Sequence, residues 1–215
     1  TDLVRIDHFR GFESYWSVPF GETTAKNGEW LPGPGDALFE ALRAALGELP
    51  IVAEDLGVIT PEVDALRLGQ GLPGMVVLQF EVGEDDFDFD AIDTNSVCYT
   101  GTHDNDTTIG WFEGAGDDTR TREEVLESQA AVLELTGGTA QTVHTDMIRL
   151  AFGSRSVLAV APMQDFLGLG SKARLNRPGT TRDNWRWRMA EGALDGALAD
   201  RIRRMVEDAS RTPEG

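Results

Sequence analysis

Residues 51–57 read IVAEDLG, a short apolar run that ends in an acid and a glycine. Residues 3–11, LVRIDHFRG, and residues 99–106, YTGTHDND, follow the same plan. Short apolar, partly β-branched runs that end in polar residues or glycine are typical of buried parallel strands. We therefore expect Asp7, Glu54 and Asp104 at the carboxyl ends of strands, where the catalytic groups of α/β barrels lie.

The whole chain alternates such runs with helical segments. We expect strands at Leu3–Asp7, Ile51–Glu54, Met75–Phe80, Ser96–Gly101 and Ser156–Ala161. Helices are expected over residues 36–46, from Pro61 onward, over 121–135 and 141–152, and over 194–206. Repeated strand–helix units predict parallel strands joined by right-handed crossovers.

Five strands are too few to close an eight-stranded barrel, and complete barrels have about 250 residues against the 215 present. The predicted fold class is therefore α/β, the C-terminal half of a (β/α)8 TIM-type barrel with parallel strands and the first strands absent. Residues 1–215 are expected to form a single partial catalytic domain. The start at Thr1, directly before a strand, is what a fragment would show.

Charge narrows the classes of partner. The chain has 37 acids against 19 bases, a formal net charge of −18, and only Lys26 and Lys172 are lysines. Such a field repels nucleic acid and anionic membrane, so neither is expected as a partner. An acid-rich, lysine-poor surface is what a salt-rich cytoplasm would favour, because salt there screens the repulsion between the acidic side chains. The acidic stretches Glu81–Asp93 and Glu113–Asp118 are interpreted as solvated loops, because they lack EF-hand spacing.

The cellular compartment is predicted from the lack of a signal peptide, of a membrane-spanning stretch and of a cysteine pair. The first residues do not resemble a signal peptide, and no apolar stretch approaches the ~20 residues of a membrane span. Cys98 is the only cysteine, lies in an apolar run and is expected to be a buried core thiol. A cytoplasmic location follows as the expectation.

Two of the three strand-end acids have candidate chemical roles and structural alternatives. Arg5 precedes Asp7 by two residues, so both side chains face the same way, and the guanidinium favours the ionised carboxylate of a nucleophile. The alternative is a structural salt bridge. Glu54 follows three apolar residues, and a drier setting favours the protonated form of a proton donor. The alternative is an acid that caps the next helix, a role that fits Asp55 better.

The third acid follows a histidine. His103 and Asp104 can both hydrogen-bond to sugar hydroxyls, and His103 can orient the acid. A metal site is the competing interpretation, but no His-x-x-x-His or Cys-x-x-Cys pair exists, so no metal is expected. His144 falls in an expected helix and is interpreted as structural. Parallel strands would bring all three acids to one edge of the sheet, which suggests glycoside chemistry.

These motifs resemble those of 4-alpha-glucanotransferases, also called amylomaltases or disproportionating enzymes, in family 77 of the glycoside hydrolases. The matching segments are Arg5–Gly11, Val52–Gly57 and Tyr99–Thr107, with Tyr15–Pro19, Thr24–Trp30, Pro162–Gly170 and Arg174–Thr180. They extend over nearly the full chain. One departure is Asp183 before Asn184-Trp185, where the family usually has a glycine, which adopts positive φ more readily.

The resemblance implies a reaction and residue roles. Asp7 would be the nucleophile, Glu54 the general acid/base and Asp104 the third carboxylate, with Arg5 and His103 as supporting residues. The implied reaction moves a 1,4-alpha-glucan segment to the 4-hydroxyl of an acceptor glucan or glucose, through a covalent intermediate and without a cofactor. The implied partners are maltooligosaccharides and other alpha-1,4-glucans.

Aromatic side chains are candidate platforms for sugars. Trp16, Trp30 and Phe80 are expected to stack on sugar faces, with core packing as the alternative, whereas Trp185 and Trp187 are expected in the core. Two other functions stay open, a retaining alpha-glucan hydrolase of the same clan and a catalytically incomplete glucan-binding fragment. The first three barrel strands of the family have no counterpart in the chain and supply part of the donor-sugar pocket, so the isolated fragment is a candidate for an inactive piece.

Overall fold

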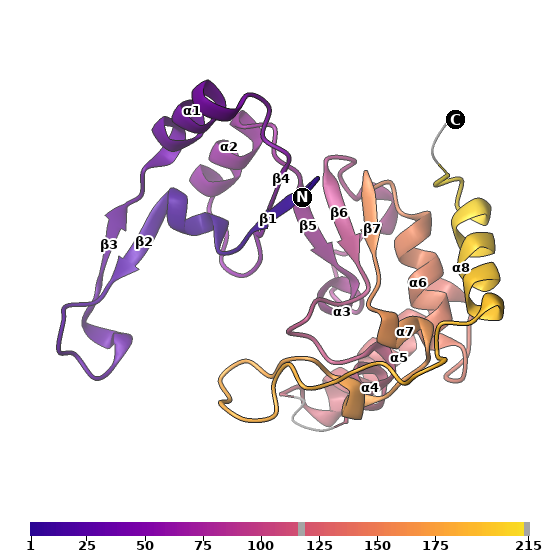
Figure 1. Ribbon diagram of the computed structural model, residues 1–215. Coiled ribbons are helices and arrows are strands. Elements are labelled where there is room, and N and C mark those ends of the chain that lie inside the picture. The colour runs from indigo at the N-terminus through magenta and orange to yellow at the C-terminus, as the bar shows by residue number, and fades with distance from the viewer. Residues whose placement is uncertain (116–118, 213–215) are drawn as a thin grey trace. The chain divides into compact units, whose positions relative to one another are not determined.

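The computed structural model describes residues 1–115 and 119–212 and is a mixed α/β structure (Figure 1). The chain divides into two compact units. The N-terminal unit comprises Thr1–Met75 and Asn95–Val97, and the C-terminal unit comprises Val76–Thr94 and Cys98–Gly215. The boundary between them falls within two strands. The single partial catalytic domain over residues 1–215 stays a prediction.

The N-terminal unit is built on a parallel strand pair. Strand β1 (Val4–Ile6) pairs with β4 (Ile51–Ala53), with Val4 opposite Ile51 and Ile6 opposite Ala53. A connection that returns to a parallel strand requires a long crossover, here containing helix α1 (Gly35–Leu46). Helix α2 (Pro61–Gly69) follows β4.

The core of this unit lies between the strand pair and its two helices. Three phenylalanine rings, Phe9, Phe12 and Phe39, have centroids 5.5–5.8 Å apart. Phe9 comes from the short 3-10 helix η1 (Phe9–Phe12) that follows β1, and Phe39 comes from α1. The other members of the cluster are Ile51, Ala53, Val63, Leu66 and Leu72. Because β4 is buried at all three positions, its ends are held in one register.

An antiparallel hairpin interrupts the crossover between β1 and α1. Strand β2 (Ser14–Ser17) pairs with β3 (Glu29–Pro32), and the 3-10 helix η2 (Ala25–Asn27) lies in the connection. Because no side chain fits beside the backbone carbonyl of Phe12, Gly33 is required where β3 ends. No strand was expected between Asp7 and Ile51, so the hairpin is an addition to the expectation.

The C-terminal unit combines a sheet with a helical layer. Strands β5 (Gly74–Val77), β6 (Ser96–Tyr99) and β7 (Leu158–Val160) are neighbours in this order in one sheet, of which the C-terminal unit contains β7 and the second halves of β5 and β6. The helices in chain order are α3 (Leu78–Glu81), η3 (Phe89–Ala91), α4 (Thr108–Glu113), α5 (Arg122–Thr136), α6 (Val143–Gly153), α7 (Met163–Phe166), η4 (Ser171–Ala173) and α8 (Gly196–Asp208).

Helix α6 lies at the centre of this unit and packs against α4, α5, α7 and α8. Its residues Val143, Met147 and Ile148 are buried in one apolar cluster with Val132 of α5 and Phe166 of α7. Cys98 belongs to the same cluster, as expected, and burial raises its pKa to about 11.

The expected elements match the structure except at one strand. Residues Met75–Phe80 were expected to be one strand, but β5 ends at Val77 and Leu78–Glu81 form a helical turn. That expectation is wrong because an apolar run fits a buried helix as well as a buried strand. Part of the acidic stretch Glu113–Asp118, residues 116–118, lies outside the described residues.

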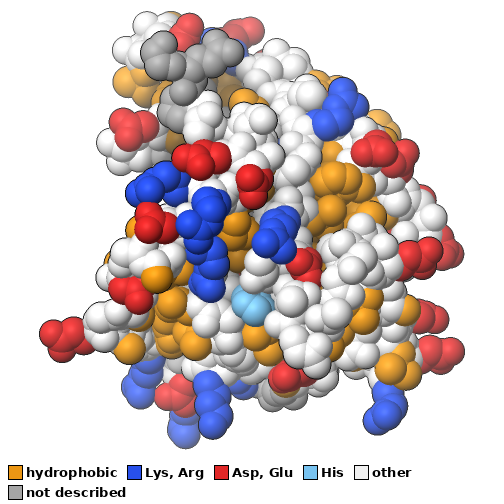
Figure 2. Space-filling model, turned by 90° about the vertical axis from the view of Figure 1, so that its right-hand side faces the viewer, with side chains coloured by type: hydrophobic (Ala, Val, Ile, Leu, Met, Phe, Trp, Pro, Cys, Tyr) orange, Lys and Arg blue, Asp and Glu red, His pale blue; other side chains and the backbone are white. Residues whose placement is uncertain are grey.

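The surface carries both signs of charge. On the face drawn in Figure 2, basic side chains lie next to acidic ones, with apolar patches between them. Among the described residues, no helix combines the length and apolar character that crossing a membrane requires.

Candidate active site

Asp7 and Glu54 directly follow two neighbouring parallel strands. Because Ile6 lies opposite Ala53, the next residue of each strand, Asp7 or Glu54, leaves the sheet at the same edge. The backbone N–H of Glu54 donates to the carbonyl of Ile6 at 2.9 Å, which continues the ladder to the strand ends. The two strand ends that carry Asp7 and Glu54 are therefore neighbours, whereas the expected convergence of Asp104 with them stays a prediction.

Backbone groups orient the Glu54 carboxylate. One oxygen accepts the N–H of His8 at 2.6 Å, and the other accepts the N–H of Leu56 at 2.9 Å. His8 adopts a left-handed conformation with φ 52°, which turns the chain sharply after Asp7. Glu54 is half-buried, and the N-cap of the next helix is Thr60, so Glu54 does not cap it.

Asp7 is held by a side chain. The guanidinium of Arg5 lies 2.8 Å from its carboxylate, as the two-residue spacing predicted. Arg5 is half-buried, and its Nε donates to the sulfur of Met75 at 3.4 Å. Asp7 itself is 75% exposed. The carboxylate is therefore both oriented and accessible, as an attacking group must be.

Asp55 is a structural acid. It accepts the N–H of Met75 at 2.8 Å and lies 3.0 Å from Nε of Arg67. Burial raises its pKa, and the Met75 N–H and the Arg67 charge act in the opposite direction. A side chain at Gly74 would overlap the Asp55 carboxylate. The interpretation of Asp55 as a helix cap is wrong, because it joins β5 to α2 instead.

Trp16 and Trp30 lie opposite each other on the hairpin. Their ring centroids are 5.4 Å apart and nearly edge-to-face, and both rings are exposed. The Arg10 guanidinium lies 4.2 Å from the Trp30 ring, and the Trp16 indole N–H donates to the carbonyl of Ala25 at 2.7 Å. Core packing, the alternative for these two residues, does not occur.

In the C-terminal unit, Asp104 lies in the loop between β6 and α4 and is 45% exposed. Its carboxylate accepts the side-chain amide N–H of Asn176 at 2.6 Å and lies 3.4 Å from Nε2 of His103. Arg174 donates to the Asp104 carbonyl at 2.6 Å. His103 and Asp104 are therefore neighbours in space, as expected.

A cavity of about 500 Å³ lies beside Asp104. Its lining includes Phe80, Trp111, Arg120 and Arg174. The Phe80 ring is exposed, so its expected role on the surface is sterically possible. Aromatic and guanidinium groups beside a carboxylate form the mixture of apolar faces and hydrogen-bonding groups that sugars require.

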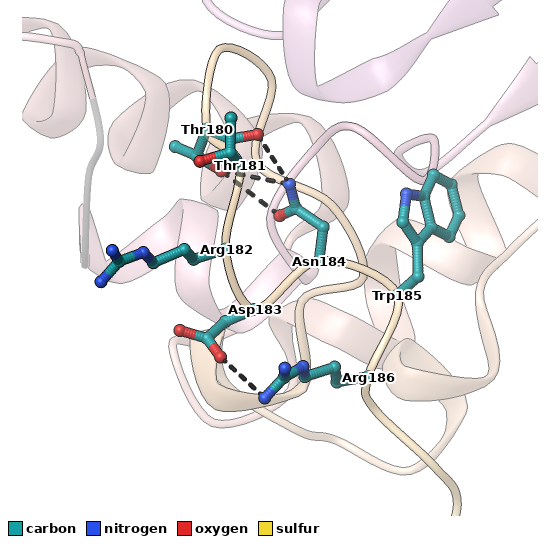
Figure 3. A pocket seen from close by; sticks show the side chains of 7 residues that line it. All are labelled: Thr180, Thr181, Arg182, Asp183, Asn184, Trp185 and Arg186. Carbon is teal, nitrogen blue, oxygen red and sulfur yellow. Dashed lines mark hydrogen bonds and ion pairs between the residues drawn. The ribbon is translucent and has the colours of Figure 1, made fainter.

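A second cavity, of about 790 Å³, is lined by Thr180–Arg186 (Figure 3). Asn184 closes this loop by accepting the N–H of Arg177 at 3.0 Å and donating to the carbonyl of Thr180 at 3.1 Å. Asp183 pairs with Arg186 at 3.2 Å and has φ 63°. Asp thus occupies, at some strain, the conformation that a glycine adopts freely.

Trp185 points away from the other labelled side chains of this loop (Figure 3). Its ring faces His103 with centroids 5.3 Å apart, and the residue is 53% exposed. The expectation that Trp185 packs in the core is wrong, because the residue is exposed; its backbone has a positive φ of 62°. Asn176 and Arg174 were not assigned roles, although both lie in a segment that carries the family resemblance.

Among residues 1–115 and 119–212, no group of three or more His, Cys, Asp or Glu side chains is arranged to hold a metal ion. The site residues that the structure describes are therefore carboxylates, a histidine, arginines and aromatic rings, which can donate protons, attack carbon and hydrogen-bond to hydroxyls.

Comparisons with known proteins agree with this chemistry. A family model described as 4-alpha-glucanotransferase matches residues 1–194. The 4-alpha-glucanotransferase of Synechocystis sp. is 50% identical over 211 residues, covering 96% of this chain and 40% of that protein. The 4-alpha-glucanotransferase of Thermus thermophilus is 45% identical over 215 residues, covering 97% of this chain and 42% of that protein.

A solved structure has the same fold. The amylomaltase from Streptococcus agalactiae in complex with acarbose matches with a TM-score of 0.87 and 31% identity, covering 99% of this chain and 42% of that chain. The chain therefore spans about two fifths of the length of the curated relatives it matches.

Proposed function

The chain belongs to the 4-alpha-glucanotransferase family, and we propose that the protein containing it transfers 1,4-alpha-glucan segments between glucans by retaining double displacement. The observation that carries this proposal is the placement of Asp7 and Glu54 on the adjoining ends of β1 and β4. Retaining chemistry uses two carboxyl groups about 5–5.5 Å apart, and neighbouring strand ends can provide such a pair.

The proposed reaction has two displacements. In the first, Glu54 protonates the glycosidic oxygen while Asp7 attacks the anomeric carbon, which forms a covalent glucanyl-enzyme. In the second, Glu54 acts as a base, accepts the proton of an acceptor 4-hydroxyl and lets that oxygen displace Asp7. Arg5 supports the ionised Asp7 through its 2.8 Å ion pair. No cofactor takes part in this scheme.

Asp104 and His103 would bind hydroxyl groups of the distorted sugar. Asn176 holds one carboxylate oxygen of Asp104, which leaves the partly exposed carboxylate able to accept further hydrogen bonds. A hydrogen bond that strengthens as the sugar ring distorts lowers the barrier more than it improves binding.

Exposed aromatic rings supply the proposed glucan contacts. Trp30 and Trp16 on the hairpin, and Phe80 at the 500 Å³ cavity, offer faces on which sugar rings can stack. Transfer would prevail over hydrolysis when acceptor sugars on such surfaces exclude water. Maltooligosaccharides and other alpha-1,4-glucans are the proposed donors and acceptors, and nucleic acid is not a proposed partner.

The unit pair is proposed to be the later part of a (β/α)8 barrel. Its terminal strands support this proposal, because Val4 of β1 and Leu158 and Val160 of β7 expose apolar side chains that a parallel sheet normally buries. Strands from the rest of a full-length relative would cover them. The 215 residues alone are then expected to bind glucan weakly or to be inactive.

A salt-rich cytoplasm is the proposed location of the protein, because the chain is rich in acids and poor in lysine. Thermal stability is then expected to rise as the salt concentration is raised.

The test is product analysis of the full-length protein with maltotriose. Transfer predicts glucose together with maltooligosaccharides longer than the substrate, whereas a retaining hydrolase predicts shorter sugars only. Glucan binding without any product would identify a catalytically incomplete binding protein. Either of the last two outcomes would overturn the proposal.

A further inference from the structure

We propose that Asp165 is a positioning residue for Asp104, because it holds together the two ends of the loop that carries Asp104. This inference rests on the proposed function for its catalytic consequence, but its structural part stands by itself. Asp165 lies on α7, 61 positions after Asp104, and does not touch the cavity beside Asp104.

The geometry of the contact is specific. One Asp165 oxygen accepts the hydroxyl of Thr100 at 2.7 Å, and the other accepts the backbone N–H of Thr108 at 2.8 Å. Thr100 directly follows β6, and Thr108 is the first residue of α4. A single carboxylate thus closes the loop Thr100–Thr108 at its base, and Asp104 lies at the middle of that loop.

Burial makes this contact costly to lose. Asp165 is 1% exposed, Thr100 and Thr108 are fully buried, and burial raises the pKa of the Asp165 carboxyl. The Thr108 N–H and the Thr100 hydroxyl oppose that shift. A buried N–H or hydroxyl without an acceptor is unfavourable, so removing the carboxylate would release both loop ends together.

The loop also has contacts within itself and with neighbouring elements. The backbone N–H of Thr100 donates to the carbonyl of Val160 on β7 at 3.3 Å, and the Gln79 side chain donates to the carbonyl of Asp106 at 3.0 Å. Asn105 accepts the N–H and the hydroxyl of Thr102 at 2.9 and 2.8 Å, and Asp106 accepts the hydroxyl of Ser171 at 2.6 Å. These contacts hold single points of the loop, whereas Asp165 links its two ends, Thr100 and Thr108, to each other. A displacement of about 1 Å can cost about 10²-fold in rate, so fixing the base of the loop matters for Asp104.

The first experiment compares three variants of the full-length protein. Asp165→Ala leaves the Thr100 hydroxyl and the Thr108 N–H without their acceptor. Asp165→Asn retains an oxygen that can accept the Thr108 N–H and adds an amide N–H that can donate to the Thr100 hydroxyl oxygen. Val132→Ala is the matched control, because Val132 is a fully buried apolar residue of the same unit that does not touch the loop.

We expect Asp165→Ala to speed amide hydrogen exchange in a peptide covering residues 100–108 by about tenfold or more, measured without sugar. With maltotriose, we expect kcat to fall about 10- to 100-fold while KM changes less than about threefold. Asp165→Asn should retain most of the loop protection and rate. Val132→Ala should lower Tm and leave the loop exchange and kcat unchanged. The inference is wrong if Asp165→Ala changes neither quantity or if Val132→Ala changes both equally.

A milder pair of variants covers the case in which Asp165→Ala does not fold. Thr100→Val removes one of the two links, and Thr100→Ser retains it, so only Thr100→Val should speed exchange and lower kcat. Combined with Asp104→Asn, Thr100→Val should lower kcat no further, and a fully additive loss would overturn the inference. If the wild type does not convert maltotriose, the proposed function fails, while the sugar-free exchange measurements still decide whether Asp165 holds the loop.

Discussion

The two units hold their strand-end carboxylates by different kinds of contact. In the N-terminal unit, Glu54 is oriented by two backbone N–H groups, and Asp7 pairs with a residue two positions away on its own strand. In the C-terminal unit, Asp104 is oriented by the side chain of Asn176, 72 positions later. The partners in the first unit therefore come from the same strand or from the neighbouring strand end, whereas the partner of Asp104 comes from a segment distant in the sequence.

The largest expected effect tests the chemical half of this comparison. Asp7→Asn retains the size of the side chain but removes the nucleophile, so we expect kcat for maltotriose disproportionation to fall at least about 10³-fold. Binding of maltooligosaccharides, measured by calorimetry, should change little. Glu48→Gln, at an exposed acid before β4, is the matched control and should leave both quantities unchanged. Full activity in Asp7→Asn would exclude Asp7 as the nucleophile.

The second prediction compares an ion pair from each unit. Arg67 and Asp55 are largely buried in the N-terminal unit, whereas Arg186 and Asp183 form an exposed pair in the C-terminal unit. Arg67→Ala leaves a buried carboxylate without its cation, so we expect it to lower the free energy of unfolding by about 3 kcal/mol. Arg186→Ala should change it by less than about 0.5 kcal/mol. Urea unfolding followed by circular dichroism measures both, and equal losses would contradict the distinction.

The difference between local and distant partners also explains which site residues the sequence could predict. Asp7, Glu54 and Arg5 were identified because a strand alternates its side chains and neighbouring parallel strands end at one edge. Asn176 and Asp165 could not be assigned, because their partners lie 72 and 65 positions away and no local pattern encodes such a contact. Trp185 is exposed in a loop where it adopts a positive φ, a conformation that non-glycine residues seldom adopt and that no local pattern predicted.

The third prediction concerns helix starts in the two units. In α5 of the C-terminal unit, the Thr121 hydroxyl accepts the N–H of Glu124, and the Glu124 carboxylate accepts the N–H of Thr121. In α2 of the N-terminal unit, the Thr60 side chain makes no capping hydrogen bond and Pro61 has no N–H to satisfy. We expect Thr121→Ala to cost about 1 kcal/mol of unfolding free energy and Thr60→Ala less than half of that. Similar losses in thermal unfolding would show that the capping box contributes nothing of its own.

The smallest expected effect is a pH dependence specific to the C-terminal unit. Burial lowers the pKa of His144 below the ordinary histidine value. The charge of Arg201 lowers this pKa further, whereas the charges of Asp165 and Asp146 raise it. Its Nδ1 is buried and has no hydrogen-bond partner among the described residues. The unfolded chain therefore binds a proton before the folded one does. The stabilisation by neutral His144 is present above the unfolded pKa of about 6.5 and is lost as the pH falls toward the folded pKa.

Asp165 contributes the opposite slope, because its raised pKa favours the folded state as the pH falls. Burial also raises the pKa of Glu81 in the same unit, so the wild-type profile sums several contributions and only a difference isolates His144. Tm measured between about pH 7.5 and 5.5 should fall more steeply for the wild type than for His144→Gln, which carries no titrating group at that position. Parallel profiles for the wild type and His144→Gln would remove His144 from the pH response.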